Sequence, residues 1–100
     1  MKYIIEDYRV YLTNKDGAIL AFVTFPKIND EEVIINHTYV DSSLRGKGIA
    51  SKLLEEAYKK IKEQNLKAIP ECSYAVKWFD DNFVKRDILK EYREDKRYDW

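Results

Sequence analysis

The chain has 100 residues, of which 45% are hydrophobic and 36% are charged. This composition is typical of a folded globular protein and excludes a disordered chain and a membrane-embedded one. Eighteen basic and eighteen acidic side chains cancel to a formal net charge of zero. The molecule as a whole therefore has no field that would attract nucleic acid or a membrane surface, and any anion-binding site must be local.

The length and the cysteine content of the chain limit its possible domain organisation, disulfides and metal sites. We expect one domain over residues 1–100, with residues 85–100 as a C-terminal tail that is either a short docked helix or a frayed end. One cysteine excludes an internal disulfide, and one histidine beside it leaves too few ligands for a zinc site, so no metal is expected. The chain also lacks a signal-peptide pattern and any apolar run of about 18 residues, which favours a cytoplasmic protein.

The first forty residues predict an antiparallel meander of three strands. Residues 8–13 alternate apolar and polar side chains, residues 14–17 form a hairpin turn signal ending in Asp-Gly, and residues 18–25 are apolar and β-branched. Pro26 ends this second strand. Residues 32–40 are the third strand, on which His37 is expected to share a face with Ile35 and Tyr39.

A basic, glycine-containing turn follows, from Leu44 to Ala50. Gly46 and Gly48 have no Cβ, so the backbone can take positive φ and approach a ligand closely. Successive N–H groups can then converge on an anion where the next helix leaves its first amides unpaired. Arg45 and Lys47 add positive charge, so the turn suits a diphosphate, although such a turn alone is also compatible with a purely structural role.

The pattern changes to a helical period at Ile49. Apolar residues recur along one face for about 14 residues, and Asn65 is suited to a left-handed helix end. Residues 66–70 form a fourth strand, which a right-handed crossover would place parallel to the third. A second helix is expected over residues 74–84 with Ser73 as its N-cap.

These residues resemble the GNAT superfamily of acyl-CoA N-acetyltransferases. Residues 45–50 fit its Arg/Gln-x-x-Gly-x-Gly/Ala phosphate loop, between a strand that ends in Val40 and an amphipathic helix. The segments 37–40 and 69–74 resemble the minimal branch of the superfamily, which is about a hundred residues long. The resemblance covers roughly residues 8–83 and implies a mixed α/β fold whose sheet parts between the third and fourth strands.

The resemblance further implies that acetyl-CoA, or coenzyme A, enters that gap. Backbone amides of the turn would hold its diphosphate, and Tyr39 and Val40 would offer strand-edge groups to its pantetheine arm. The implied cofactor-binding residues of the turn are Arg45, Gly46, Lys47, Gly48, Ile49, Ala50 and Ser51.

Two side chains are candidates for catalysis. His37 is either a hydrogen-bonded residue at the core edge or a base that removes a proton from an ammonium acceptor. Cys72 is either a small buried hydrophobe or a thiol activated at a helix N-terminus. The amine would attack acetyl-CoA directly with His37 as base, or Cys72 would first take the acetyl group. Tyr74 is a further candidate, as proton donor to the leaving thiolate.

The sequence thus predicts an N-acetyltransferase that acts on a primary amine of a small molecule or a protein. A rival hypothesis is a CoA-binding module without turnover, such as a sensor that acts with a partner protein. It is favoured by the small size, because the chain lacks the segments that shape the acceptor pocket of larger GNAT enzymes. A nucleotide- or RNA-binding loop is a third hypothesis, and the neutral charge opposes it. We expect a monomer or a weak homodimer.

Overall fold

Six strands and two main helices make up the fold, in a computed structural model that describes residues 1–90. Residues 91–100, which hold most of the predicted tail, lie outside the described part. The strands are β1 (Lys2–Ile5), β2 (Arg9–Thr13), β3 (Ile19–Thr24), β4 (Glu32–Ile35), β5 (His37–Val40) and β6 (Lys67–Pro70). The helices are α1 (Ile49–Glu63) and α2 (Ser73–Asp81), with the short 3-10 helices η1 (Ser42–Leu44) and η2 (Phe83–Ile88).

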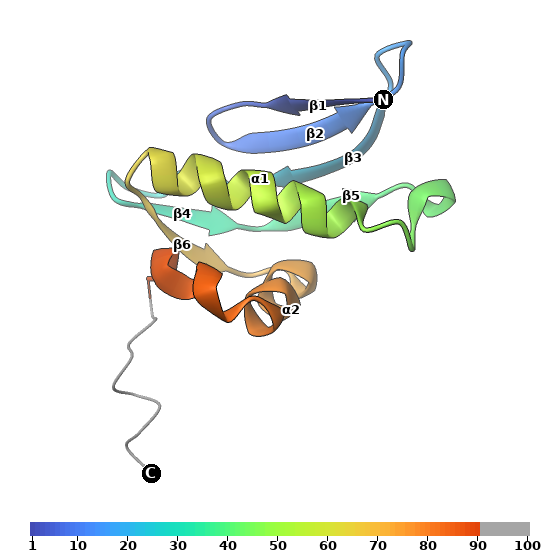
Figure 1. Cartoon of the computed structure of the whole chain (residues 1–100). Helices are drawn as coiled ribbons and strands as arrows, with labels where there is room; N and C mark the ends of the chain where they lie inside the picture. The colour runs from blue at the N-terminus through green and yellow to red at the C-terminus, as the bar shows by residue number, and fades with distance from the viewer. Residues whose placement is uncertain (91–100) are drawn as a thin grey trace.

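The strands form two sheets rather than one (Figure 1). One is antiparallel with the order β1-β2-β3-β5, and the other is the parallel pair β4-β6. The predicted mixed α/β class, the hairpin and the parallel fourth strand are confirmed. The N-terminal strand β1 was not predicted from the sequence, because four residues without a clear alternation carry too weak a signal.

The predicted third strand is interrupted at Asn36. Before this residue the strand is β4 and pairs with β6, and after it the strand is β5 and pairs with β3. The buried positions also change phase across the interruption, because Val33 and Ile35 are buried in β4 but Val40 is buried in β5. His37 is exposed and no longer shares a face with Ile35, so that part of the sequence prediction is wrong.

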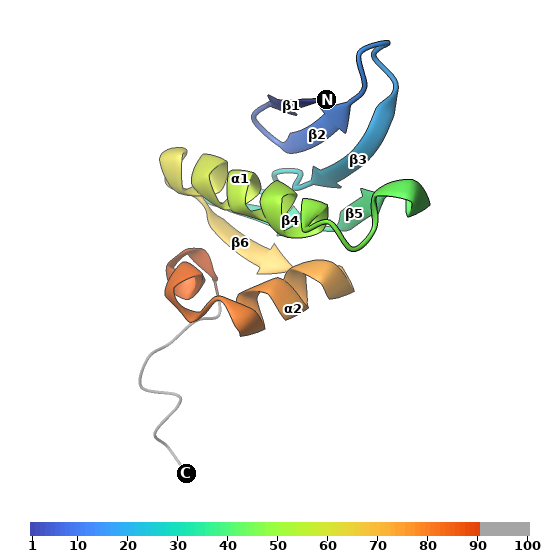
Figure 2. The ribbon, with the colours of Figure 1, turned by 45° about the vertical axis from the view of Figure 1, so that its right-hand side comes forward.

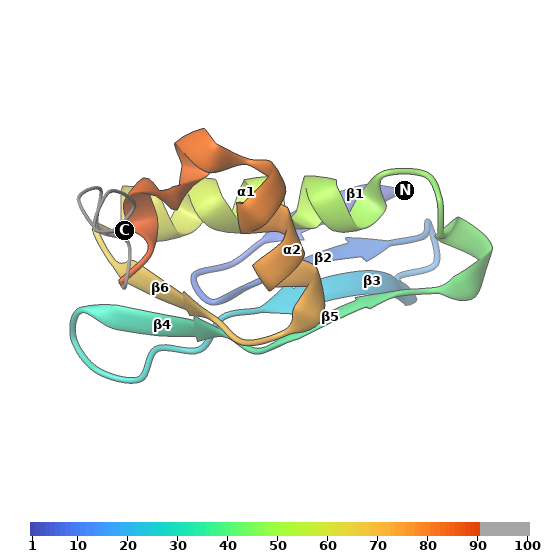
Figure 3. The ribbon, with the colours of Figure 1, turned by 90° about the horizontal axis from the view of Figure 1, so that it is seen from below.

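The helices lie on one side of the sheets (Figure 3). The apolar face of α1 is buried against β2 and β3, and Leu53 is fully buried there. The other face of the sheet carries alternate residues such as Thr24 and Phe22, and no helix within residues 1–90 covers it. Figure 2 shows α2 following β6. The Trp78 ring of α2 lies 6.3 Å from the Tyr58 ring of α1, measured between centroids. Across residues 1–90, no helix is long and apolar enough to span a membrane.

Both ends of α2 differ from the sequence prediction. The N-cap is Cys72, not Ser73, and its side chain makes no capping hydrogen bond. The helix begins early because the N–H groups of Glu71 and Cys72 both donate to the Ile35 carbonyl, at 2.9 and 3.2 Å. It ends at Asp81, not at residue 84, because Asn82 leaves the helical conformation with φ of −126°. By contrast, Asn65 has φ of 60°, which confirms the predicted left-handed end of α1.

We predict that Leu53→Ala destabilises the chain by about 2–5 kcal/mol, because it leaves a cavity between α1 and the sheet. The free energy of unfolding, measured by urea titration, tests this. Lys59→Ala on the exposed face of α1 is the control and should change stability by less than about 0.5 kcal/mol. Equal effects of the two substitutions would contradict the packing of α1 described above.

Candidate functional site

The turn before α1 has the backbone conformation that an anion site needs. Gly46 and Gly48 have φ of 82° and 76°, and Gly48 is the N-cap of α1. No side chain makes a capping hydrogen bond there. The first amides of a helix have no intrahelical acceptor, so those of Ile49, Ala50 and Ser51 are available to a ligand at the positive end of the helix dipole.

Asp41 fixes the path of the chain into this turn. Its carboxylate accepts a hydrogen bond from the Ser43 N–H at 3.1 Å and another from the Ser43 hydroxyl, which caps η1. These bonds, from Ser43 above all, lower the pKa of the Asp41 carboxyl below its ordinary value. Arg45 continues the turn by donating from Nε to the Val40 carbonyl at 3.2 Å. Hydrogen bonds to Asp41 and to the Val40 carbonyl therefore hold the turn against the end of β5.

A cavity of about 150 Å³ lies over the turn. The residues that line it are Val40, Leu44, Arg45, Gly46, Gly48, Ile49, Ala50, Ser51 and Tyr74. The cavity thus brings together most of the predicted cofactor-binding residues, and it adds Tyr74 from α2. Lys47 is exposed in the turn and is not part of the lining, and neither is Tyr39.

A larger hollow of about 370 Å³ continues between α1 and α2 and shares Ala50, Ser51 and Tyr74 with the first cavity. Trp78 lines it and donates from Nε1 to the Ser51 hydroxyl at 3.1 Å. Only 6% of Trp78 is exposed, and its ring packs edge-on against Phe79 at 5.0 Å between centroids. Trp78 is therefore a core residue and also a wall of the hollow.

One edge of β5 has no strand partner in the described part of the chain, because β5 is the last strand of its sheet. The Asp41 N–H donates to the Leu20 carbonyl at 2.8 Å. Since hydrogen-bonding direction alternates along an antiparallel strand, the backbone groups of Tyr39 point toward β3 and those of Thr38 and Val40 toward the open edge. Thr38 was not selected from the sequence. Only the register of the strand identifies it.

The two candidate catalytic side chains, His37 of β5 and Cys72 at the start of α2, lie on opposite sides of the sheet. The Thr38 hydroxyl lies 3.1 Å from the Cys72 sulfur, on the side of the sheet that the helices cover. His37 precedes Thr38, so its exposed side chain projects from the opposite face. Register pairs it with Thr24 rather than with any residue of α2. The structure therefore places Thr38, and not His37, directly against the thiol.

A parted sheet, a glycine turn at the N-terminus of the following helix and a cavity at that turn define a GNAT-type acyltransferase fold. The chain belongs to the GCN5-related N-acetyltransferase family, whose model matches residues 8–88. Proteins of this family generally use acetyl-CoA, and the uncapped amides and positive-φ glycines of the turn fit its diphosphate.

Relatives in sequence and in structure agree with this assignment. Protein NATD1 of Xenopus tropicalis is 31% identical over 74 residues, which are 74% of this chain and 63% of that protein. The human NATD1 match is also 31% identical and covers 61% of that protein, so the chain spans less than two thirds of these curated relatives. A GCN5-like protein from Staphylococcus aureus, solved by NMR, superposes with a TM-score of 0.76 at 25% identity, over 97% of this chain and 95% of that one. Tetrahymena GCN5 shares the fold at 9% identity, with a TM-score of 0.60 over 92% of this chain and 58% of its own.

We predict that Asp41→Ala lowers stability at pH 7 and that this deficit shrinks as the pH falls toward the lowered folded-state pKa of Asp41. A carboxyl whose pKa is lowered by folding stabilises the native state above its unfolded-state pKa, and this stabilisation is lost as the pH falls through the folded-state value. Urea unfolding of both proteins at pH 7 and near pH 3 measures the difference. A deficit that is the same at both pH values would contradict the ionised cap.

Proposed function

We propose that the chain binds acetyl-CoA at the glycine turn and transfers the acetyl group to a primary amine. The observation that carries this proposal is the N-terminus of α1, where two glycines with positive φ and an uncapped first turn line a cavity beside the open edge of β5. A diphosphate would accept hydrogen bonds from amides of residues 46–51, with Arg45 and Lys47 adding positive charge.

In this proposal the pantetheine arm extends along the open edge of β5, toward Asn36, where β4 ends and β5 begins. Its amides would pair with the outward-pointing backbone groups of Thr38 and Val40, in the manner of strand addition. The Val40 carbonyl is already an acceptor for Arg45, so Thr38 supplies the freer pair of groups. The strand register favours Thr38 over Tyr39 for the strand-edge contact. The Tyr39 ring packs against the Phe22 ring, with 5.6 Å between the centroids.

For the chemistry we propose direct attack. The amine nitrogen bonds to the thioester carbonyl carbon, the carbon–sulfur bond breaks, and coenzyme A leaves as a thiolate. The amine must lose two protons overall, one on becoming a neutral nucleophile and one after attack. His37 would accept a proton from the acceptor at neutral pH. Tyr74, which lines the cavity from α2, would donate a proton to the thiolate.

The covalent route through Cys72 stays as an alternative. Its sulfur lies beside the Thr38 hydroxyl at the N-terminus of α2. In this route Thr38, and not His37, would contact the thiol, because His37 projects from the opposite face of β5. A CoA-binding module without turnover remains the second candidate function. This second candidate is favoured because no helix within residues 1–90 covers the other face of the sheet.

We predict that Gly48→Ala weakens coenzyme A binding, because Ala resists the φ of 76° at the N-cap and its methyl group stands where a ligand approaches. No atom lies within 4 Å of the added Cβ, so the cost to folding comes from the backbone alone. Gly17→Ala, at φ of 87° in the β2–β3 turn, is a matched control with the same kind of strain far from the site.

Both glycine variants should lose about 1–2 kcal/mol of stability, whereas only Gly48→Ala should lose affinity in isothermal titration with coenzyme A. If Gly17→Ala weakened binding equally, or if Gly48→Ala bound like the parent, the turn would not be the diphosphate site.

We predict that Cys72→Ala retains acetyl transfer and that His37→Ala loses about 100-fold or more in kcat at neutral pH, a typical contribution of a general base. Release of coenzyme A with a panel of primary amines gives the rates. Intact mass after incubation with acetyl-CoA alone checks the alternative. An acetyl adduct that is absent from Cys72→Ala, together with loss of turnover in that variant, would establish the covalent route instead.

A further inference from the structure

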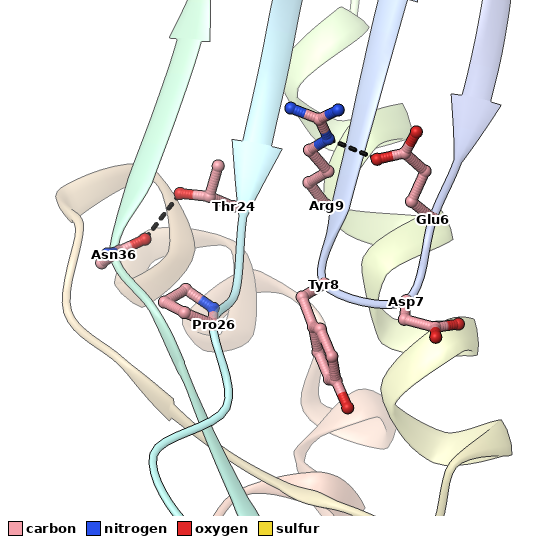
Figure 4. Close-up of a pocket in the computed structure, with 7 residues that line it drawn as sticks. All are labelled: Glu6, Asp7, Tyr8, Arg9, Thr24, Pro26 and Asn36. Carbon is pink, nitrogen blue, oxygen red and sulfur yellow. Dashed lines mark hydrogen bonds and ion pairs between the residues drawn. The ribbon is translucent and has the colours of Figure 1, made fainter.

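A separate cavity opens on the sheet face that the helices leave uncovered (Figure 4). Its volume is about 640 Å³. It is lined by residues 6–8 between β1 and β2, by Arg9 at the start of β2, by Thr24 and Pro26 at the end of β3, and by Asn36. The Phe25 N–H donates to the Tyr8 carbonyl at 2.8 Å, which holds the β1–β2 turn against the end of β3. The size is within the range of small-molecule sites.

His37 does not line the cavity but lies in register with two residues that do, Arg9 and Thr24. Arg9 pairs with Thr24 across β2 and β3, and Thr24 pairs with His37 across β3 and β5. Directly opposed residues project from the same face of a sheet, so these three side chains form one row on the uncovered face. Two strand spacings, roughly 10 Å, separate the first and last backbones of the row. Asn36, whose Oδ1 accepts a hydrogen bond from the Thr24 hydroxyl at 2.6 Å, lies between β4 and β5, where the chain changes strand partners.

Arg9 lines the cavity and carries a positive charge, and its guanidinium pairs with Glu6 at one edge of it. Arg9 donates from Nε to Glu6, and its guanidinium lies over the Tyr11 ring at 4.9 Å from the centroid. The bond from Arg9 lowers the pKa of the Glu6 carboxyl and raises that of the guanidinium, so both groups are charged at neutral pH. A guanidinium has five N–H donors, and the remaining ones suit a carboxylate.

The acidic side chains of this cavity are already paired. Glu6 accepts from Arg9 and, at 3.3 Å, from the Tyr11 hydroxyl, while the Asp7 carboxylate lies 3.5 Å from the Lys60 ammonium. A ligand with a carboxylate would bind the N–H donors that Arg9 retains beyond the bond from Nε to Glu6.

We propose that this cavity is the acceptor site and that the acceptor is a primary amine that also carries a carboxylate. Arg9, held by Glu6, binds the carboxylate, and the row from Arg9 through Thr24 directs the amine toward His37 at the parting of the strands. The inference rests on the proposed acetyl transfer for its chemistry, but the site and its ligand class can be tested without it.

The kinetic test compares two acceptors, 6-aminohexanoate and hexylamine, which has the same chain and lacks the carboxylate. We expect the amino acid to have a KM about tenfold lower than the amine, as for a charge-assisted hydrogen bond at a partly exposed site. Arg9→Gln should raise the KM for the amino acid by a similar factor, leaving the KM for hexylamine and kcat nearly unchanged, and Arg9→Lys should be intermediate. Lys15→Gln, an exposed charge in the β2–β3 turn, is the matched control.

A binding test separates this inference from the proposed function. When the 15N-labelled chain is titrated with 6-aminohexanoate without acetyl-CoA, the amide signals of Arg9, Thr24 and Asn36 should shift, and Arg9→Gln should remove the shifts. If these amides shift but no amine is acetylated, the site stands and the transferase proposal fails. If 6-aminohexanoate and hexylamine are acetylated equally, or if 6-aminohexanoate moves none of the three amides, the acceptor assignment is overturned.

Discussion

The interruption of the third strand at Asn36 is the constraint on which the rest of the structure depends. At this residue the chain changes partners, from β6 to β3, and the buried face changes phase. The Ile35 carbonyl, which accepts from both Glu71 and Cys72, starts the turn into α2 at the same level. The open edge of β5, the N-terminus of α2 and the exposed His37 all result from this one change of register.

Different physical effects determine the structure at the two ends of the proposed site. At the far end of β5, positive φ at Gly46 and Gly48 turns the chain so that α1 presents unpaired amides, and Asp41 and Arg45 secure the turn. At the near end, register alone determines which side chains face the helices and which face the uncovered sheet. A cofactor held at the glycines and an acceptor held beside His37 would therefore meet where the sheets part.

Much of this organisation could be predicted from the sequence because it depends on local patterns. The helical period from Ile49, the Asp-Gly hairpin and the glycine turn are local signals, and Asn65 adopts the left-handed conformation expected of it. The change of phase at Asn36 could not be predicted, because it arises from competition between β3 and β6 for one strand. The face of His37, the contact between Thr38 and Cys72, and the cavity beside Arg9 all depend on that change. The functional assignment of these residues stays a prediction.

The most direct test of the account is a crystal structure of the chain with coenzyme A. The account predicts the diphosphate against the backbone amides of residues 46–51 and the pantetheine arm along the open edge of β5, reaching toward Asn36. Coenzyme A bound elsewhere, or crystals grown with saturating coenzyme A in which the glycine turn contacts no phosphate, would contradict it.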